Sequence, residues 1–459
     1  MIDYNEDTIA AIATKLGVGA ISIIRVSGKD AIPLVNKIFS GKDLEKVDTH
    51  TINYGYIKKE NEKIDEVLVS VMKAPKTFTR EDVVEINCHG GINSTLAVFS
   101  LLQEIGIRVA EKGEFTKRAF LNGRIDLTEA EAIMDLIESK SDNQRKLAMN
   151  SLEGKLKNYI HSFREPLKKL IANIEVNIDY PEYYDIEEVT KKDIEKEVEK
   201  LIPKLQKTIE ESKSHQIVKS GIKTVIVGRP NVGKSSILNT LINQEKAIVT
   251  DIEGTTRDTI EEFVTVEGVP LKLIDTAGIR EAKDEVEKIG IAKSKEIAKD
   301  ADLIIAIFDS SRDLTDEDRE ILNIIKGKNA ILVLNKTDLN KKIDENMPEI
   351  IDSCKYIVKI STLEQQGLED LYKIIGNMFS MEEISVDNTA IITNLRHKNL
   401  ISKALESCKQ AMDALTNGMP LDIIAVFLKE ILENLGEITG EIVTDDIISE
   451  IFSKFCLGK

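Results

Sequence analysis

The fold of the middle of this chain follows from one stretch, Gly228-Arg-Pro-Asn-Val-Gly233-Lys234-Ser235. The apolar run 223–227 precedes it and the helical pattern 236–242 follows it, so we expect a buried strand, a glycine-rich loop and a helix in succession. In such a loop, backbone N–H groups and the helix N-terminus bind phosphates, Lys234 reaches the β and γ oxygens, and Ser235 binds Mg²⁺. The stretch therefore predicts a phosphate-binding loop in an α/β domain.

Two later segments supply further phosphate and magnesium chemistry. A second predicted strand, 271–275, ends in Asp275-Thr-Ala-Gly278, where the Asp275 carboxylate can hold the Mg²⁺ shell and the Gly278 amide can approach a γ-phosphate. Between the loop and this strand lies Gly254-Thr255-Thr256-Arg257-Asp258. A threonine there can close on Mg²⁺ only while the γ-phosphate is present, which predicts a switch segment.

The base is read by a fourth motif. Asn335-Lys336-Thr-Asp338 follows the apolar run 330–334, and Asp338 can accept two hydrogen bonds from guanine N1 and N2, which adenine cannot supply. Ser361-Thr362, after a predicted strand at 356–360, is a weaker fifth motif. The order of these motifs predicts a guanine nucleotide. We expect nucleotide contacts from Asn231, Val232, Gly233, Lys234, Ser235, Ser236, Thr250, Asp251, Ile252, Glu253, Gly254, Thr255, Thr256, Asp275, Thr276, Ala277, Gly278, Asn335, Lys336, Asp338, Ser361 and Thr362.

Catalysis needs a water-positioning group, because Ile279 occupies the place where Ras-like GTPases carry a glutamine. Glu287 is our candidate for this role, although Glu281, Asp284 and Glu285 are neighbours of the same chemistry. We expect Lys234 to stabilise charge on the phosphates.

A second positive charge has three candidate sources, namely Arg257, Arg280 and a monovalent cation. Asn231 offers a side-chain carbonyl beside the phosphates, and the backbone carbonyls of Thr250, Ile252 and Thr255 can complete a K⁺ site if their loop folds over it. Alternatively, Asn231 satisfies the backbone of its own loop.

Composition limits the class of protein. The chain has 459 residues and a net charge of −17, which argues against a broad nucleic-acid-binding face on this chain alone. Its four cysteines show no paired spacing, so we expect neither a disulfide framework nor a zinc site. No apolar run has the length of a membrane span and the N-terminus carries no basic leader, so we expect a soluble cytoplasmic protein.

The pattern of elements changes three times along the chain. Residues 1–120 mix strands, expected at 19–27, 51–58, 66–73 and 83–88, with helices at about 29–39 and 91–105. Residues 121–218 are helical and begin at a capping box, Thr128-Glu-Ala-Glu131. Strands and helices alternate over 219–378, and 379–459 are helical again. We therefore expect a multidomain α/β protein: an N-terminal α+β domain, a discontinuous helical domain, and an inserted Ras-like G domain with a mainly parallel six-stranded sheet.

The whole chain resembles the tRNA-modification GTPase MnmE (TrmE) family. The segments that carry the resemblance are Ile23–Gly28, Asp82–Gly91, Gly113–Asn122, Gly228–Ser236, Gly254–Asp258, Asp275–Gly278, Glu437–Glu441 and Phe455–Lys459. An isoleucine after D-x-x-G together with a terminal F-C-x-G-K is a specific combination.

The resemblance implies an activity and its partners. Members of this family form homodimers, and they act with a flavoprotein, MnmG (GidA), in a heterotetramer. Together the two proteins add a carboxymethylaminomethyl or aminomethyl group to C5 of the wobble uridine (U34) of certain tRNAs. The one-carbon donor is a tetrahydrofolate derivative (5-formyl- or 5,10-methylene-tetrahydrofolate), and FAD is expected in the partner. GTP hydrolysis accompanies K⁺-dependent dimerisation of the G domains.

The resemblance also implies site residues. It assigns K⁺ to Asn231, Thr250, Ile252 and Thr255, Mg²⁺ to Ser235 and Thr256, and water positioning to Glu287. It places folate in the N-terminal dimerisation domain, at Arg25, Glu85, Arg124 and Lys459. Cys456 is either a reactive thiol or a small packed side chain.

Two other functions compete with this one. A regulatory GTPase of ribosome assembly or RNA binding would share the G domain, but we expect it to carry a compact basic RNA-binding module, and none is visible in the sequence. A nucleotide-dependent kinase is disfavoured because no segment resembles a phosphoacceptor site.

Overall fold

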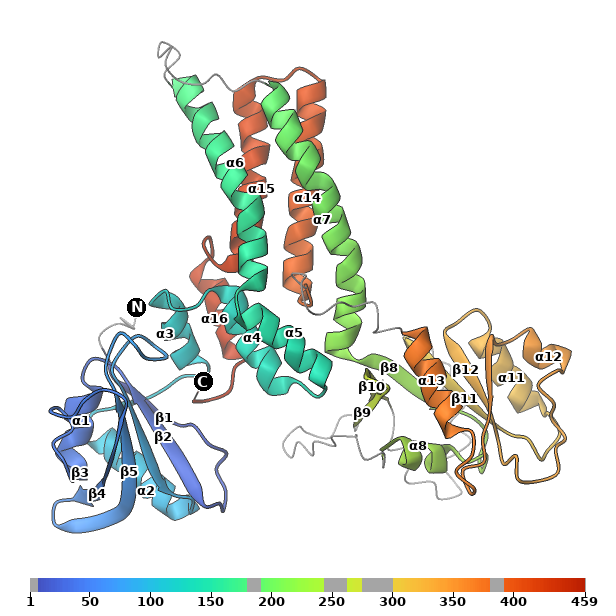
Figure 1. The fold of residues 1–459 in the computed structure, drawn as a ribbon, viewed down its shortest axis with the longest axis horizontal. Coiled ribbons are helices and arrows are strands. Elements are labelled where there is room, and N and C mark those ends of the chain that lie inside the picture. Colours follow the sequence, from blue (N-terminus) through green and yellow to red (C-terminus); the bar gives the residue numbers. More distant parts are fainter. Residues whose placement is uncertain (1–6, 180–190, 243–261, 275–299, 380–391, 459) are drawn as a thin grey trace. The chain divides into compact units, whose positions relative to one another are not determined.

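The computed structural model describes residues 7–179, 191–242, 262–274, 300–379 and 392–458 (Figure 1). The chain divides into two compact units. The first comprises Met1–Met134, Ser151–Val198 and Glu406–Lys459, and the second comprises Asp135–Asn150 and Glu199–Leu405. Each unit is thus assembled from separate stretches of the chain.

The N-terminal part of the first unit is a seven-stranded sheet with the strand order β3-β4-β5-β6-β2-β1-β7. Its strands are antiparallel except for the parallel pair β1 and β7. Successive side chains of a strand point to opposite faces of the sheet. In β5, Val67, Val69 and Val71 are therefore buried, whereas Leu68, between Val67 and Val69, is exposed. The strands are β1 (Ile9–Ile12), β2 (Ile21–Ser27), β3 (Phe39–Ser40), β4 (Thr51–Lys59), β5 (Glu62–Met72), β6 (Val83–His89) and β7 (Arg108–Val109).

Helices cover the two faces of this sheet unequally. Helices α1 (Ala31–Ile38) and α2 (Ile92–Glu104) enclose the apolar core on one face. On the other face, α3 (Glu114–Leu121) inserts Phe115 beside Ile9 and Ala11 of β1. The strands β4 and β5 leave apolar side chains exposed on that same face.

The strands and helices expected before residue 120 are confirmed, with ends shifted by at most four residues. The sequence analysis missed β1, β3, β7 and α3. Two of these strands have only two residues each, too few to establish a hydrophobic period.

Long helices make up much of the remaining first unit. Helix α6 packs against α15, as Figure 1 shows. Apolar residues recur every three or four positions along both, as in Ile160, Phe163 and Leu167 of α6, so each helix presents a buried stripe. Some helices outside the two sheet domains, such as α5, α7 and α14, lie mostly or partly in the second unit. All of them together are α4 (Leu127–Glu138), α5 (Asp142–Leu152), α6 (Lys155–Asp179), α7 (Lys191–Ser220), α14 (Leu395–Thr416), α15 (Leu421–Thr439) and α16 (Asp445–Ser453).

The start of α4 corrects one prediction. The expected capping box, Thr128 to Glu131, begins two residues too late. The Asp126 carboxylate accepts hydrogen bonds from the Glu129 amide (2.8 Å) and the Thr128 hydroxyl (2.8 Å), and the Asp126 amide donates to the Glu129 carboxylate (2.7 Å). Aspartate caps a helix as well as threonine does, and here Thr128 is already inside the helix.

The second unit contains a six-stranded sheet with the order β13-β12-β11-β8-β10-β9. Five strands are parallel and only β9 is antiparallel, which confirms the expected mainly parallel sheet. Its strands are β8 (Ile222–Val227), β9 (Glu262–Val266), β10 (Val269–Leu273), β11 (Leu303–Asp309), β12 (Ala330–Asn335) and β13 (Tyr356–Lys359), and its helices are α8 (Lys234–Ile242), α11 (Asp316–Ile325), α12 (Pro348–Ile351) and α13 (Leu368–Met378).

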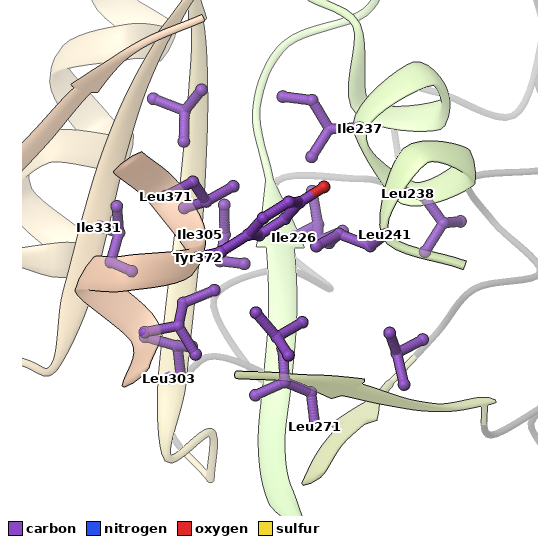
Figure 2. Close-up of a cluster of buried hydrophobic side chains, with 14 of the residues drawn as sticks. Ile226, Ile237, Leu238, Leu241, Leu271, Leu303, Ile305, Ile331, Leu371 and Tyr372 are labelled. Atoms are coloured by element: carbon purple, nitrogen blue, oxygen red, sulfur yellow. The ribbon is translucent and has the colours of Figure 1, made fainter. Parts of the chain in front are cut away.

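Apolar clusters fill both faces of this sheet, so β11 and β12 are buried along their whole length. Figure 2 shows one cluster, in which Ile237, Leu238 and Leu241 of α8 and Leu371 and Tyr372 of α13 lie over the strands. The carboxyl ends of β8, β11 and β12 are thereby held side by side. The expected multidomain α/β class is confirmed.

Candidate functional site

The phosphate-binding loop joins β8 to α8. Asn231 and Gly233 have positive φ angles of 62° and 101°. A Cβ atom on Gly233 would lie 2.2 Å from Nδ2 of Asn335, and one on Gly228 would lie 2.5 Å from the Ile307 carbonyl oxygen. No side chain fits at either position, so the loop forms a tight cradle. Lys234 Nζ donates to the carbonyls of Gly228 (2.9 Å) and Arg229 (2.8 Å) across this cradle.

The N-K-x-D motif contacts this loop directly. Asn335 Nδ2 donates to the Val232 carbonyl (2.8 Å), and Lys336 Nζ donates to the Asn231 carbonyl (2.8 Å). The Ser361 hydroxyl donates to Asp338 Oδ1 (2.7 Å), which connects the fourth and fifth motifs. Three segments that are distant in the sequence therefore meet at one edge of the sheet, where the carboxyl ends of its strands lie.

Asp309 is a residue of this site that the sequence analysis missed. Lys336 Nζ donates to its carboxylate at 2.8 Å. Burial alone would raise the pKa of Asp309, but the hydrogen bonds from Lys336 and Ser311 lower it below the usual range. Asp309 ends the buried run Leu303–Asp309, and an acidic residue at the end of such a strand is a signal that could have identified it.

Several predicted nucleotide and catalytic residues lie outside the described part of the chain. They are Thr250, Asp251, Ile252, Glu253, Gly254, Thr255, Thr256, Asp275, Thr276, Ala277, Gly278, Arg280 and Glu287. Lys459, predicted for the folate site, also lies outside it.

The first unit brings together the other predicted folate residues that the structure describes. Arg25 and Glu85 are paired across β2 and β6, with Arg25 Nε donating to Glu85 Oε1 at 2.9 Å and Nη2 lying 2.8 Å from the same oxygen. The Arg25 guanidinium also lies over the Phe115 ring, 5.8 Å from its centroid. Both charged side chains are about one quarter exposed, so a ligand can reach them.

The C-terminal segment ends beside this pair. Its Gly458 carbonyl accepts a hydrogen bond from Arg25 Nη1 (3.3 Å), and the Cys456 carbonyl accepts one from the Gly113 amide (3.3 Å). A Cβ on Gly458 would lie 2.8 Å from the Ile12 carbonyl oxygen, so this close approach requires glycine. Residues more than 400 positions apart in the sequence therefore form one site. Cys456 is exposed, whereas Cys88, Cys354 and Cys408 are buried.

Arg124 is exposed and held against Phe78. Its Nη1 donates to the Phe78 carbonyl (3.3 Å), and its guanidinium carbon lies 4.7 Å from the centroid of the Phe78 ring. Phe78 in turn packs against the cluster that contains Phe115. Arg25 and Arg124 are thus linked by two aromatic side chains.

A network of ion pairs centred on the buried Arg118 lies beside the proposed folate site. Arg118, with 2% of its side chain exposed, pairs with Asp7 (2.6 Å), Glu114 (2.9 Å) and Glu81 (3.1 Å). Burial alone would raise the pKa of Glu114, but hydrogen bonds from Arg108, the Glu111 amide and Arg118 hold it below its usual range. Because every charge in the network has an opposite partner, the network fixes the position of α3 relative to the sheet.

Two family models match the chain. The model of the TrmE N-terminus, described as that of a GTP-binding protein, covers residues 8–124, and the model of the MnmE helical domain covers residues 127–456. A curated relative from Streptococcus thermophilus, the tRNA modification GTPase MnmE, is 52% identical over 455 residues, which is 99% of this chain and 98% of the relative. The protein of the same name from Bacillus cytotoxicus is 50% identical, with 99% of each chain covered.

The chain belongs to the MnmE family of tRNA modification GTPases. It is accordingly an enzyme that hydrolyses GTP and takes part in tRNA modification. Among solved structures, the G domain of the T. maritima FeoB iron transporter matches 35% of this chain and 99% of its own length, at 29% identity and a TM-score of 0.26. In the described part of this MnmE-family chain, no helix is both long and apolar enough to cross a membrane.

Proposed function

We propose that this GTPase acts with the flavoprotein MnmG to add a carboxymethylaminomethyl group to C5 of the wobble uridine of certain tRNAs. Hydrolysis converts GTP and water to GDP and phosphate. The observation that carries the proposal is the joint presence of a phosphate loop contacted by the N-K-x-D motif and, in the other unit, the Arg25–Glu85–Gly458 group. A simple regulatory GTPase has no use for the second site.

The phosphate loop fits a nucleotide with Mg²⁺. Gly228 and Gly233 carry no side chain that would block the backbone, and Lys234 lies inside the cradle. Ser235 is in the first turn of α8, where its hydroxyl can bind the metal. Asp338 reads guanine, and Thr256 is the second Mg²⁺ ligand in the proposal. When bound, the metal would neutralise part of the negative charge of the phosphates, and Lys234 and the loop amides would orient them.

K⁺ binding is proposed at Asn231, with the carbonyls of Thr250, Ile252 and Thr255. The positive φ of Asn231 supports this role, because a strained non-glycine residue on a phosphate loop points to function. Glu287 would position the attacking water, and Arg280 is a further catalytic candidate. Turnover should then be faster in K⁺ than in Na⁺ at equal ionic strength, and equal rates in the two salts would count against the K⁺ site.

The group around Arg25 fits a tetrahydrofolate donor. The Glu85 carboxylate can accept hydrogen bonds from pterin N–H groups, and Arg25, Arg124 and Lys459 offer positive charge to the glutamate carboxylates. Phe78 and Phe115 supply an apolar surface between these charges. The bound folate would supply the one-carbon unit, and FAD would reside in MnmG.

A homodimer is proposed through the open face of the N-terminal sheet. Ile21, Ile52, Tyr54 and Leu68 are 47–69% exposed on adjoining strands of this face. Arg25 and Glu85 point from the same face, because they keep the alternation of the exposed residues along β2 and β6.

We also propose domain boundaries near residues 120, 218 and 378, a cytoplasmic location, and a heterotetramer with MnmG.

The deciding experiment is nucleoside mass spectrometry of tRNA from a deletion strain. We expect the modified wobble uridine to disappear, to return with the wild-type gene, and not to return with an Arg25→Ala or a Lys234→Ala variant. If uridine modification is unchanged in the deletion strain, the proposal fails, and a role in ribosome assembly becomes the better explanation.

A further inference from the structure

In the described part of the chain, two arginines beside the proposed folate site have no acidic partner. Arg80 and Arg124 are both exposed, and among the described residues neither forms an ion pair. The partly buried Arg108, by comparison, pairs with Asp7 and Glu114. Arg25, by contrast, forms an ion pair with Glu85.

The two guanidinium groups are held in place by reciprocal contacts with each other's segment. Arg80 Nη1 donates to the Asn122 carbonyl (2.9 Å), while Arg124 Nη1 donates to the Phe78 carbonyl (3.3 Å). Asn122 Nδ2 closes the contact by donating to the Thr79 carbonyl (2.6 Å). Within the part of the chain that the structure describes, each guanidinium therefore donates one hydrogen bond to the protein, and its other N–H groups can donate to a ligand.

The backbone at Arg80 is held in a conformation that an arginine rarely adopts, with φ at 60°. The residues on either side of Arg80 are held by hydrogen bonds. The Thr79 hydroxyl bonds Ser27 (2.7 Å), and the Glu81 carboxylate bonds Ser27 (2.7 Å) and Arg118 (3.1 Å). Such strain is tolerated where it aims a side chain at a ligand, whereas a glycine would fit this backbone without strain.

We propose that Arg80 and Arg124 bind the carboxylates of an oligo-γ-glutamyl tail on the tetrahydrofolate donor. This inference rests on the proposed folate site. The pterin end is assigned to Glu85 and the aromatic middle to Phe115 and Phe78, so the tail emerges at Arg124, which lies on the Phe78 ring. A donor with one glutamate carries its two carboxylates on a single residue, whereas each added γ-linked glutamate brings one more carboxylate farther along the tail.

The test compares 5-formyltetrahydrofolate bearing one glutamate with the same compound bearing three, by calorimetric titration of the full chain. We expect the three-glutamate form to bind the wild type about fivefold more tightly, as for one exposed charge pair. Arg80→Gly removes the guanidinium and suits the positive φ, so it should keep the affinity for the one-glutamate form and lose the preference. Arg80→Lys should keep part of the preference, and Lys76→Ala, an exposed cation in the same loop, should keep all of it.

The outcomes separate the two proposals. If the wild type binds neither compound, the folate site itself is wrong. If it binds both but Arg80→Gly retains the preference, or weakens both equally, the folate site stands and the tail assignment is overturned. A loss of tRNA binding in Arg80→Gly with an unchanged glutamate preference would assign the guanidinium to RNA phosphate and likewise overturn it.

Discussion

At the scale of single residues, the nucleotide site depends on side chains that bridge motifs. Asn335 and Lys336 connect the base-reading segment to the phosphate loop through the carbonyls of Val232 and Asn231. A hydrogen bond from Ser361 orients the Asp338 carboxylate that would face the base. Hydrogen bonds of 2.8 Å therefore join the segment proposed to read the base to the loop proposed to bind the phosphates.

An Asp338→Asn substitution should change the base that is recognised. The amide cannot accept two hydrogen bonds from guanine N1 and N2, so we expect GTP affinity to fall by about 100-fold or more. Xanthosine triphosphate, which presents an oxygen in place of the 2-amino group, should bind better than GTP. Equilibrium binding of fluorescent analogues measures both affinities. Asp313→Asn, at an exposed carboxylate, is the control, and an unchanged GTP affinity in Asp338→Asn would refute the assignment.

At the scale of elements, helix α3 is held by charge as well as by Phe115. Asp7, Glu81 and Glu114 surround Arg118, and Arg108 closes the network by pairing with Asp7 and Glu114. The C-terminal segment lies on the same region through Gly113, whose amide donates to Cys456. A change in this network should therefore affect both α3 and the site around Arg25.

Protonation should loosen α3. For Asp7, as for Glu114, burial alone would raise the carboxyl pKa, but Arg108 and Arg118 lower it below the ordinary value. A carboxyl with a lowered folded-state pKa contributes stability above its unfolded pKa and loses it as the pH falls through the folded value. We expect the hydrogen-exchange protection of α3 amides, corrected for intrinsic rates, to be constant near neutral pH and to fall below about pH 4.

Glu114→Gln is the matched variant. It leaves the buried Arg118 guanidinium short of one charge partner and should cost about 3 kcal/mol of local stability at neutral pH. In this variant, the hydrogen-exchange protection of α3 amides should fall less steeply with decreasing pH than in the wild type. Equal acid sensitivity in the two proteins would show that other groups control α3.

At the scale of the whole molecule, the N-terminal sheet has an exposed apolar face, which we propose as the dimer interface. Ile52, Tyr54 and Leu68 lie on the side of the N-terminal sheet that α1 and α2 do not cover, together with Arg25 and Glu85. Association of two copies through this face would cover apolar side chains and enclose the folate group from water. Dimerisation and donor binding are then expected to support each other.

Leu68→Glu should produce a monomer, because it places a carboxylate on that face directly opposite Tyr54. We expect light scattering to give half the wild-type mass, and folate affinity to fall along with dimerisation. The control is Leu96→Glu, at a similarly exposed position on α2, which packs on the other face of the sheet. A dimeric Leu68→Glu variant would place the dimer interface elsewhere.

The sequence predicted local patterns well and long-range contacts poorly. The strand–loop–helix around Gly233 and the strand before Asn335 carry motifs with strong local signals, so their elements are confirmed. The hydrogen bond from Arg25 to Gly458 and that from Arg80 to Asn122 depend on how distant segments meet, which no periodicity encodes. Asp126 was missed as a helix cap because a second, equally plausible capping pattern begins at Thr128.

The packing of α6 against α15 has a consequence for how the protein is made. While the ribosome translates the second unit, the buried stripe of α6 has emerged and its partner helix has not yet been synthesised. The nascent polypeptide must therefore carry unprotected apolar side chains throughout that interval, which is the period in which chaperones act on incomplete chains. Ribosome stalling between the two helices would leave this stripe exposed and prone to aggregation.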